Sequence, residues 1–184
     1  MTVTDLAMTT GVDLRHAIAA IPDPEVPVIT IAELGILRDV DVDDSSRSVT
    51  VTITPTYSGC PAMAAIGDRI RHEAHLRGYA AQVATRLSPA WTTDWMSQSG
   101  KDKLEQFGIA PPGPAGAGGL SDPRDMGDRG DKGAVPVTIA RHVVVCPQCG
   151  SIDTTEIAHF GSTACKALRR CEACREPFDE FKAL

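Results

Sequence analysis

Four cysteines near the C-terminus occur as two CxxC pairs, a spacing typical of metal ligands. Cys146 and Cys149 form the first pair, Cys171 and Cys174 form the second, and 21 residues separate the two pairs. Two tight CxxC turns that a short sheet brings together can hold one ion between four sulfurs. We predict a structural zinc ion here. The alternatives are iron or an iron–sulfur cluster and, less favoured by the doubled motif, a redox-active thiol pair.

A further cysteine, Cys60, stands between a predicted strand and a predicted helix. Pro61 is a favoured first residue of a helix, which places Cys60 at the N-cap. The free N–H groups and the helix dipole at this position stabilise a thiolate, and Gly59 keeps the sulfur accessible. The residues alone leave open whether Cys60 does chemistry or only caps a helix.

Two carboxylates, Asp23 and Glu25, lie in a segment stiffened by Pro24 and Pro27. Carboxylates on a rigid loop can bind a cation, but a solvated turn that ends a helix has the same composition. The segment by itself does not decide between these readings.

The elements that would position these residues form an α+β fold, a small α/β sandwich with helices packed on one sheet. Apolar residues at helical spacing predict helices over 12–21 and 61–77, with Asp13 as the first N-cap and Gly78 as the second stop. Residues 91–107 are also predicted to be mostly helical. Alternating apolar residues predict strands over 36–42, 48–54 and 81–87.

A Gly- and Pro-rich stretch divides the chain. Residues 1–109 form the first predicted domain, residues 110–136 a flexible linker, and residues 137–184 a four-cysteine all-β zinc ribbon. Short strands are expected at 141–145, 152–157 and 177–181. Because a module this small has little core, metal binding should contribute much of its folding free energy.

Composition excludes several classes of function. Aromatic residues make up 4% of the 184 residues and the net charge is -6, which argues against a nucleic-acid partner. No apolar run is long enough for a membrane helix and no secretion signal is visible. We therefore expect a cytoplasmic protein with reduced thiols.

Several segments together resemble a known family. DPEVPVITIAELGI and TPTYSGCPA resemble the metal–sulfur cluster biosynthetic domain. The segments SPAWTTDWM, FGIAPP, CPQCGS, FGSTACKALRRC and EPFDEFK resemble the PaaD component of the phenylacetyl-CoA 1,2-epoxidase system of aerobic phenylacetate catabolism. The resemblance covers nearly the whole chain outside the linker.

The resemblance implies an accessory protein that assists iron–sulfur or di-iron cofactor assembly in its partners, an oxygenase subunit and an iron–sulfur flavin reductase. A homo-oligomer is left open. No catalysis of its own is expected, because the chain has no paired ExxH motifs and no nucleotide-binding loop. In this reading Cys60 holds iron or a cluster transiently. The neighbours expected to position that iron are Asp23, Glu25, Thr54 and Thr56.

Three other residues are candidates with open alternatives. Cys165 is either a buried thiol of the ribbon or a second functional sulfur near the four-cysteine site, and a cluster shared with Cys60 is a further option if the two domains fold together. Trp91 and Trp95 are spaced to share one helix face, where they either pack in the core or bind a partner subunit.

Two other functions compete with cofactor assembly. A structural or docking subunit would use the ribbon and the tryptophans to bind the oxygenase. An electron-transfer protein would carry redox-active iron in the four-cysteine site.

Overall fold

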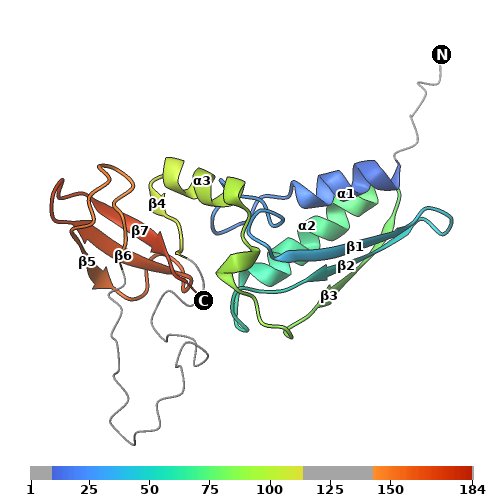
Figure 1. The fold of residues 1–184 in the computed structure, drawn as a ribbon. Helices are drawn as coiled ribbons and strands as arrows, with labels where there is room; N and C mark the ends of the chain where they lie inside the picture. Colours follow the sequence, from blue (N-terminus) through green and yellow to red (C-terminus); the bar gives the residue numbers. More distant parts are fainter. Residues whose placement is uncertain (1–9, 114–142, 184) are drawn as a thin grey trace, which may run out of the picture. The chain divides into compact units, whose positions relative to one another are not determined.

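The computed structural model describes residues 10–113 and 143–183, which fall into two compact units divided between Phe107 and Gly108. Each unit has its own sheet (Figure 1). Ala110, the first residue of the predicted linker, lies in a strand of the second unit, and residues 114–136 lie outside the described ranges. Across those ranges, no helix is long and apolar enough to cross a bilayer.

The first unit is built on a three-stranded sheet of β1 (Leu37–Asp43), β2 (Ser48–Ile53) and β3 (Ala80–Thr85). β2 is central, antiparallel to β1 and parallel to β3. The parallel pair requires a crossover, which α2 (Ala62–Leu76) provides. This arrangement confirms the predicted α+β class.

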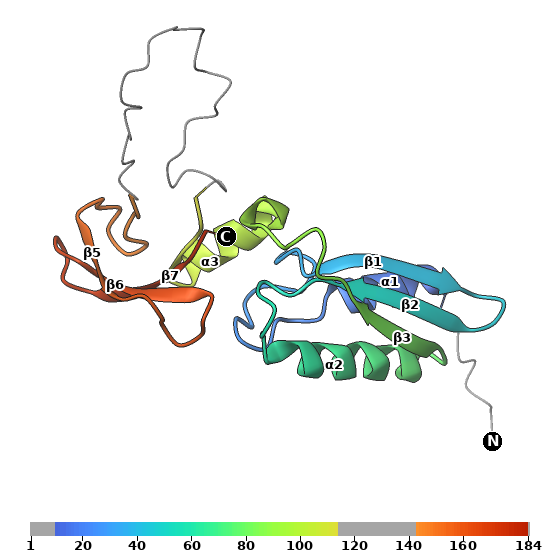
Figure 2. The same ribbon diagram turned by 90° about the horizontal axis from the view of Figure 1, so that it is seen from below.

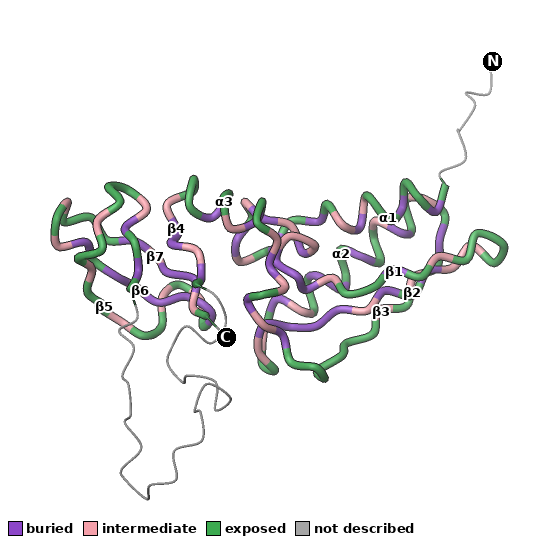
Figure 3. The backbone as a smooth tube through the Cα atoms, viewed as in Figure 1, coloured by how far each residue is buried: buried purple, intermediate pink, exposed green. Residues whose placement is uncertain are grey.

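Helices α1 (Gly11–Ala19) and α2 pack against each other and against the edge strands, so they cover one face of the sheet (Figures 1 and 2). The core is aliphatic because β2 turns every second residue toward the helices. Its fully buried side chains include Leu14, Ile18, Val49, Val51, Ile53, Ile66 and Ile70. Figure 3 colours the backbone by burial, and every second residue of the central strand β2 is buried.

The start of α1 differs from the prediction. Thr10, not Asp13, is the N-cap. The Thr10 hydroxyl accepts from the Asp13 N–H at 3.3 Å, and the Asp13 carboxylate accepts from the Thr10 N–H at 3.0 Å. This reciprocal capping box satisfies two backbone donors, whereas an N-cap at Asp13 would leave the preceding turn unformed.

Residues 91–107 are less helical than predicted. A short 3-10 turn, η1 (Thr93–Trp95), precedes α3 (Gln98–Gln106), and Met96 and Ser97 between them are extended. Ser97 ends the extended stretch by capping α3, since its hydroxyl accepts from the Gly100 N–H at 3.0 Å. Trp91 lies outside any helix, so the prediction that it shares a helix face with Trp95 is wrong.

The second unit is a four-stranded sheet in the order β4–β7–β6–β5. Its strands are β4 (Ile109–Ala110), β5 (Thr154–Ala158), β6 (Lys166–Cys171) and β7 (Pro177–Phe181). Strands β5 and β7 confirm the predictions for 152–157 and 177–181. The strand expected at 141–145 is not formed over 143–145, and residues 141–142 lie outside the described ranges.

Candidate functional site

The four cysteines of the two CxxC pairs converge on one point. All four sulfurs lie within 4.8 Å of one another. The Sγ atoms of Cys146 and Cys174 are 3.8 Å apart, and those of Cys149 and Cys171 are 3.6 Å apart. A tetrahedral ion with zinc–sulfur bonds of about 2.3 Å requires sulfurs about 3.8 Å apart. The thiols are free, so the cluster has the donor set and spacing of a metal site.

The two pairs are held by the same backbone pattern. In the first, Cys146 N–H donates to Ser151 O, and Gly150 N–H donates to Cys146 O, both at 2.9 Å. In the second, Cys171 N–H donates to Glu176 O, and Arg175 N–H donates to Cys171 O, both at 3.0 Å. Each turn therefore closes on itself and directs its sulfurs toward those of the other pair.

The thiols of Cys171 and Cys174 ionise at different pH values. The Cys174 N–H donates to Cys171 Sγ at 3.5 Å. This bond is the main cause that lowers the pKa of Cys171 to about 6. For Cys174 a bond to the Glu176 backbone opposes the shift, but burial and the neighbouring thiols raise its pKa to about 12. Four sulfurs this close can all be thiolates only when a cation neutralises them.

A small apolar cluster supports the site from within the second unit. Ala110 of β4 and Phe178 of β7 are buried with Cys146 and Cys171, and Cys174 packs against them. Cys149 is exposed, so one sulfur faces solvent. β4 thus contributes a residue that the sequence assigned to the linker.

Cys165 lies away from this centre. It directly precedes β6, whereas Cys171 ends it, and six strand residues span about 20 Å. Cys165 is buried and its Sγ lies 3.0 Å from the Thr163 hydroxyl. It is therefore not a second sulfur beside the metal centre. Sharing of a cluster with Cys60, which belongs to the other unit, stays a prediction.

Cys60 forms the entry to α2. The helix N-cap is Pro61, one residue later than predicted. The Cys60 N–H donates to Tyr57 O at 3.2 Å, and its carbonyl accepts from Met63 N–H at 3.4 Å. Cys60 is half-buried and is in no disulfide. It lies in a turn at the positive end of the helix dipole.

Asp23 organises the acidic loop, which we define as residues 22–30. Its carboxylate is buried and accepts from the Glu25 N–H at 2.9 Å and the Val26 N–H at 2.8 Å. The base of the loop is closed by the Asp23 N–H, which donates to Ile29 O, and by a bridge between Pro22 and Thr30. Glu25 is half-buried.

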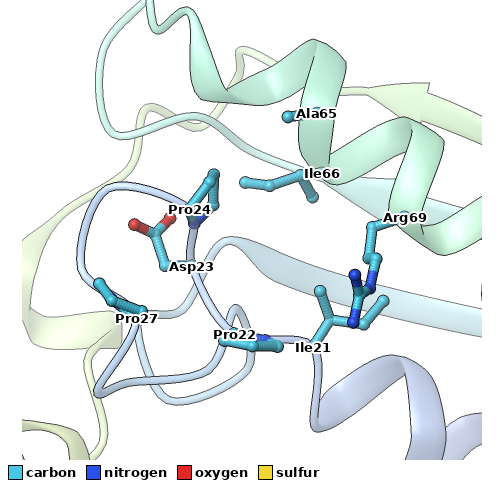
Figure 4. A pocket seen from close by; sticks show the side chains of 8 residues that line it. All are labelled: Ile21, Pro22, Asp23, Pro24, Pro27, Ala65, Ile66 and Arg69. Carbon is cyan, nitrogen blue, oxygen red and sulfur yellow. The ribbon is translucent and has the colours of Figure 1, made fainter.

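The acidic loop faces the first turns of α2 across a cavity of about 280 Å³. The lining side chains, seen in Figure 4, are Ile21, Pro22, Asp23, Pro24, Pro27, Ala65, Ile66 and Arg69. Of the predicted site residues, only Asp23 lines this cavity. Arg69 was not predicted, because only the packing of α2 against the loop brings it there.

Thr54 and Thr56 are both buried in the segment that follows β2 and leads to Cys60. The Thr54 N–H donates to Ile36 O at 2.8 Å, and Leu37 N–H donates to Ile31 O at 3.0 Å. These bonds tie the end of β2 to the segment that follows the acidic loop. Their role toward iron stays a prediction.

The tryptophans differ in environment. Trp91 is buried, and its Nε1–H donates to Leu34 O at 3.0 Å, so it packs in the core. The ring of Trp95 is half-buried, with the Arg38 guanidinium 3.6 Å from its centroid. Binding of a partner through Trp95 stays a prediction.

Two family models match the chain. Residues 12–83 match a model described as an iron–sulfur cluster assembly protein, and residues 132–182 match one described as the PaaD zinc beta ribbon domain. A putative PaaD-type component of the 1,2-phenylacetyl-CoA epoxidase from Escherichia coli K12 is 41% identical over 91% of this chain and 89% of its own length. The chain belongs to the PaaD family.

Two further similar proteins each match half of the chain. An Fe-S protein maturation auxiliary factor from Porphyromonas gingivalis is 31% identical over 50% of this chain and 87% of its own length. A crystal structure of a domain of unknown function from Bacillus anthracis is 26% identical, with a TM-score of 0.45, over 50% of this chain and 87% of its own.

Proposed function

We propose that this PaaD-family chain assists the assembly of iron-containing cofactors in the other subunits of a phenylacetyl-CoA epoxidase system. The observation that carries the proposal is the position of Cys60. It is a half-buried thiol, in no disulfide, just before α2, and it closely precedes the helix face that meets the acidic loop. The domain that contains it matches the family of iron–sulfur cluster assembly proteins.

In this proposal iron or an iron–sulfur cluster is cargo and not a resident cofactor. The Cys60 thiolate binds it, and the N–H groups of the first turn of α2 favour that thiolate. Asp23, Glu25, Thr54 and Thr56 supply oxygen donors from the neighbouring segments. A single sulfur ligand suits cargo, because a cluster held by few protein ligands can leave for a partner that offers more.

The four-cysteine site has a separate role as a structural zinc site. Sulfur-only coordination with four ligands leaves no open position for a reaction. The match to a zinc beta ribbon family supports zinc over iron. The ion links the end of β6 and the turn that follows it to the segment before β5, and so it stabilises a unit with a small core.

Cluster transfer tests the proposal. The wild-type chain and Cys60→Ser are reconstituted anaerobically with iron and sulfide, and transfer to the apo reductase subunit is followed by visible absorption. Cys165→Ser, which also removes a thiol outside the four-cysteine site, is the matched control. We expect transfer by the wild type and none by Cys60→Ser. With Cys60 as the single sulfur ligand, Cys165→Ser also transfers, and this result would exclude a cluster shared by the two cysteines. Equal transfer by all three would overturn the proposal.

A docking role is the second candidate, and exposed apolar side chains in the ribbon favour it. These are Val143, Val145, Ile152, Ile157 and Phe160, each at least 47% exposed. Such a density of exposed large apolar residues is typical of interaction surfaces. If docking is the main role, Ile152→Ser with Phe160→Ser abolishes co-sedimentation with the oxygenase subunit, whereas Cys60→Ser leaves maturation intact.

A further inference from the structure

A segment outside both matched family regions is bound tightly to the base of the acidic loop. Residues 91–106, which we call the brace, include η1 and α3 and follow the iron–sulfur assembly match, which ends at residue 83. Their contacts with residues 30–35 are polar and directional, buried at Trp91 and exposed at Ser99 and Lys103. The contacts centre on Glu33, whose side chain is 17% exposed.

The Glu33 carboxylate joins the brace to the loop. Its Oε1 accepts from the Ser99 hydroxyl and the Lys103 ammonium of α3, both at 2.7 Å. Its Oε2 accepts from the Thr30 N–H at 3.0 Å, and the Glu33 N–H donates back to the Thr30 hydroxyl at 3.1 Å. Thr30 is the residue that bridges to Pro22 and closes the acidic loop.

The backbone approach between the two segments is equally close. The Ser97 N–H donates to Glu33 O at 2.9 Å, and Trp91 Nε1–H donates to Leu34 O at 3.0 Å. A Cβ atom on Gly100 would lie 3.0 Å from Glu33 O, so only glycine lets α3 come this near. The brace is therefore hydrogen-bonded to the Glu33 side chain and to the main chain of residues 33–34.

We infer that the brace positions the acidic loop. Glu33 is the positioning residue, because it is bonded both to α3 and to Thr30 at the base of the loop. The chain of contacts runs from α3 to Glu33, from Glu33 to Thr30, and from Thr30 to the loop base next to Asp23. The inference rests on the proposed function, because it gives the loop a purpose as part of the cargo site. It assigns a role to residues 91–106, which the general cluster assembly match does not cover.

The matched variants lie on one helix. Ser99→Ala with Lys103→Ala removes the two side-chain donors that α3 offers to the Glu33 carboxylate. Lys101→Ala is the control, because it removes a lysine of the same helix that makes no side-chain bond within the described residues. Hydrogen exchange is measured by NMR on the full chain at the Glu25 and Val26 amides, which donate to Asp23. The amides of Val49 and Val51 in the core strand β2 report global stability.

We expect the double variant to speed exchange at Glu25 and Val26 by about tenfold more than at the β2 amides, and Lys101→Ala to match the wild type at both places. Unchanged loop exchange would overturn the inference. Equal acceleration in β2 would also overturn it, because the brace would then only stabilise the unit as a whole.

Iron loading separates this inference from the proposed function. We expect the double variant to load iron and sulfide several times more slowly than the wild type. A variant that carries Lys103→Arg in place of Lys103→Ala should load at nearly the wild-type rate, because arginine keeps a cationic donor to Glu33. If the wild type and Cys60→Ser load equally, the proposed function fails and the exchange result is unaffected. If loading requires Cys60 but the double variant loads normally with a loosened loop, the positioning role is contradicted.

Discussion

Gly150 and Arg175 occupy equivalent places in the two cysteine turns, and both have a positive φ, of 74° and 69°. This left-handed conformation is easy for glycine and costs about 1 kcal/mol for other residues. A Cβ on Gly150 would contact nothing within 4 Å, so the cost there is in the backbone alone. The sequence has a glycine at the first turn, but it does not show that Arg175 adopts the same conformation in the second.

Reciprocal substitutions test this equivalence. Gly150→Ala should lower, and Arg175→Gly should raise, the free energy of metal-dependent folding of the ribbon by about 1 kcal/mol. The midpoint of metal release in a chelator titration measures both. Because the ion pair between Arg175 and Glu172 is exposed, its loss contributes little. Shifts in the same direction for both variants would contradict the equivalence.

The two buried cysteines at opposite ends of β6 should differ in their effect on metal content. Cys171→Ser removes one of four converging sulfurs, so the purified variant should lose its metal and the ordered ribbon. Cys165→Ser changes a thiol at the far end of the strand and should keep one metal per chain. Elemental analysis measures both. Metal loss from Cys165→Ser would contradict the assignment of the four ligands.

At the scale of elements, the hairpin of β1 and β2 was predictable because apolar and polar residues alternate along both strands. The strand β6 was missed, since its sequence KALRRC holds three basic residues. Two of these charges are matched only in three dimensions: Lys166 pairs with Asp179 at 3.1 Å, and Arg169 pairs with Glu180, both partners on β7. Such pairing between strands leaves no local pattern in the sequence.

The candidate site was likewise predictable where its structure is local and not where it depends on packing between elements. The four-cysteine centre followed from the spacing of its ligands, because each CxxC turn is a local structure. The cavity beside Asp23 did not, since Arg69 reaches it through packing of α2. Trp91 and Trp95 suggested a helix by their spacing, but Trp91 instead bonds to Leu34, far away in the sequence.

The bond network of Glu33 predicts a pH dependence for the first unit. Burial alone would raise the pKa of Glu33, but the bonds from Lys103, Ser99 and Thr30 outweigh it and lower the pKa to about 2 from 4.5. The folded chain therefore keeps the carboxylate to lower pH than the unfolded chain does. The stabilisation is complete above about pH 4.5 and is lost as the pH falls through about 2.

Glu33→Gln should therefore lower the unfolding free energy by about 1 kcal/mol at pH 7, and the difference from wild type should shrink toward pH 2. Urea unfolding followed by tryptophan emission at several pH values measures this difference. A difference that is independent of pH would show that the charge of Glu33 does not contribute.

At the scale of the whole molecule, each unit has its own sheet and core, and the two depend on different forces. The first buries aliphatic side chains between helices and sheet. The second has a smaller cluster that includes its own metal ligands. Both tryptophans of the sequence, Trp91 and Trp95, lie in the first unit, so their fluorescence reports on that unit alone.

Metal removal should consequently unfold the second unit and leave the first intact. A strong chelator with a thiol-blocking reagent should release the metal and reduce the circular dichroism of the ribbon strands. The tryptophan emission maximum should not move. A red shift that accompanies metal release would show that the first unit depends on the ribbon.

The central claim is that the chain separates a structural metal site from a cargo-binding thiol. Metal content after anaerobic reconstitution with iron and sulfide tests it most directly, with Cys60→Ser beside the wild type. We predict one zinc in both proteins and iron in the wild type only. Equal iron in both proteins, or iron in place of zinc at the four cysteines, would contradict this claim.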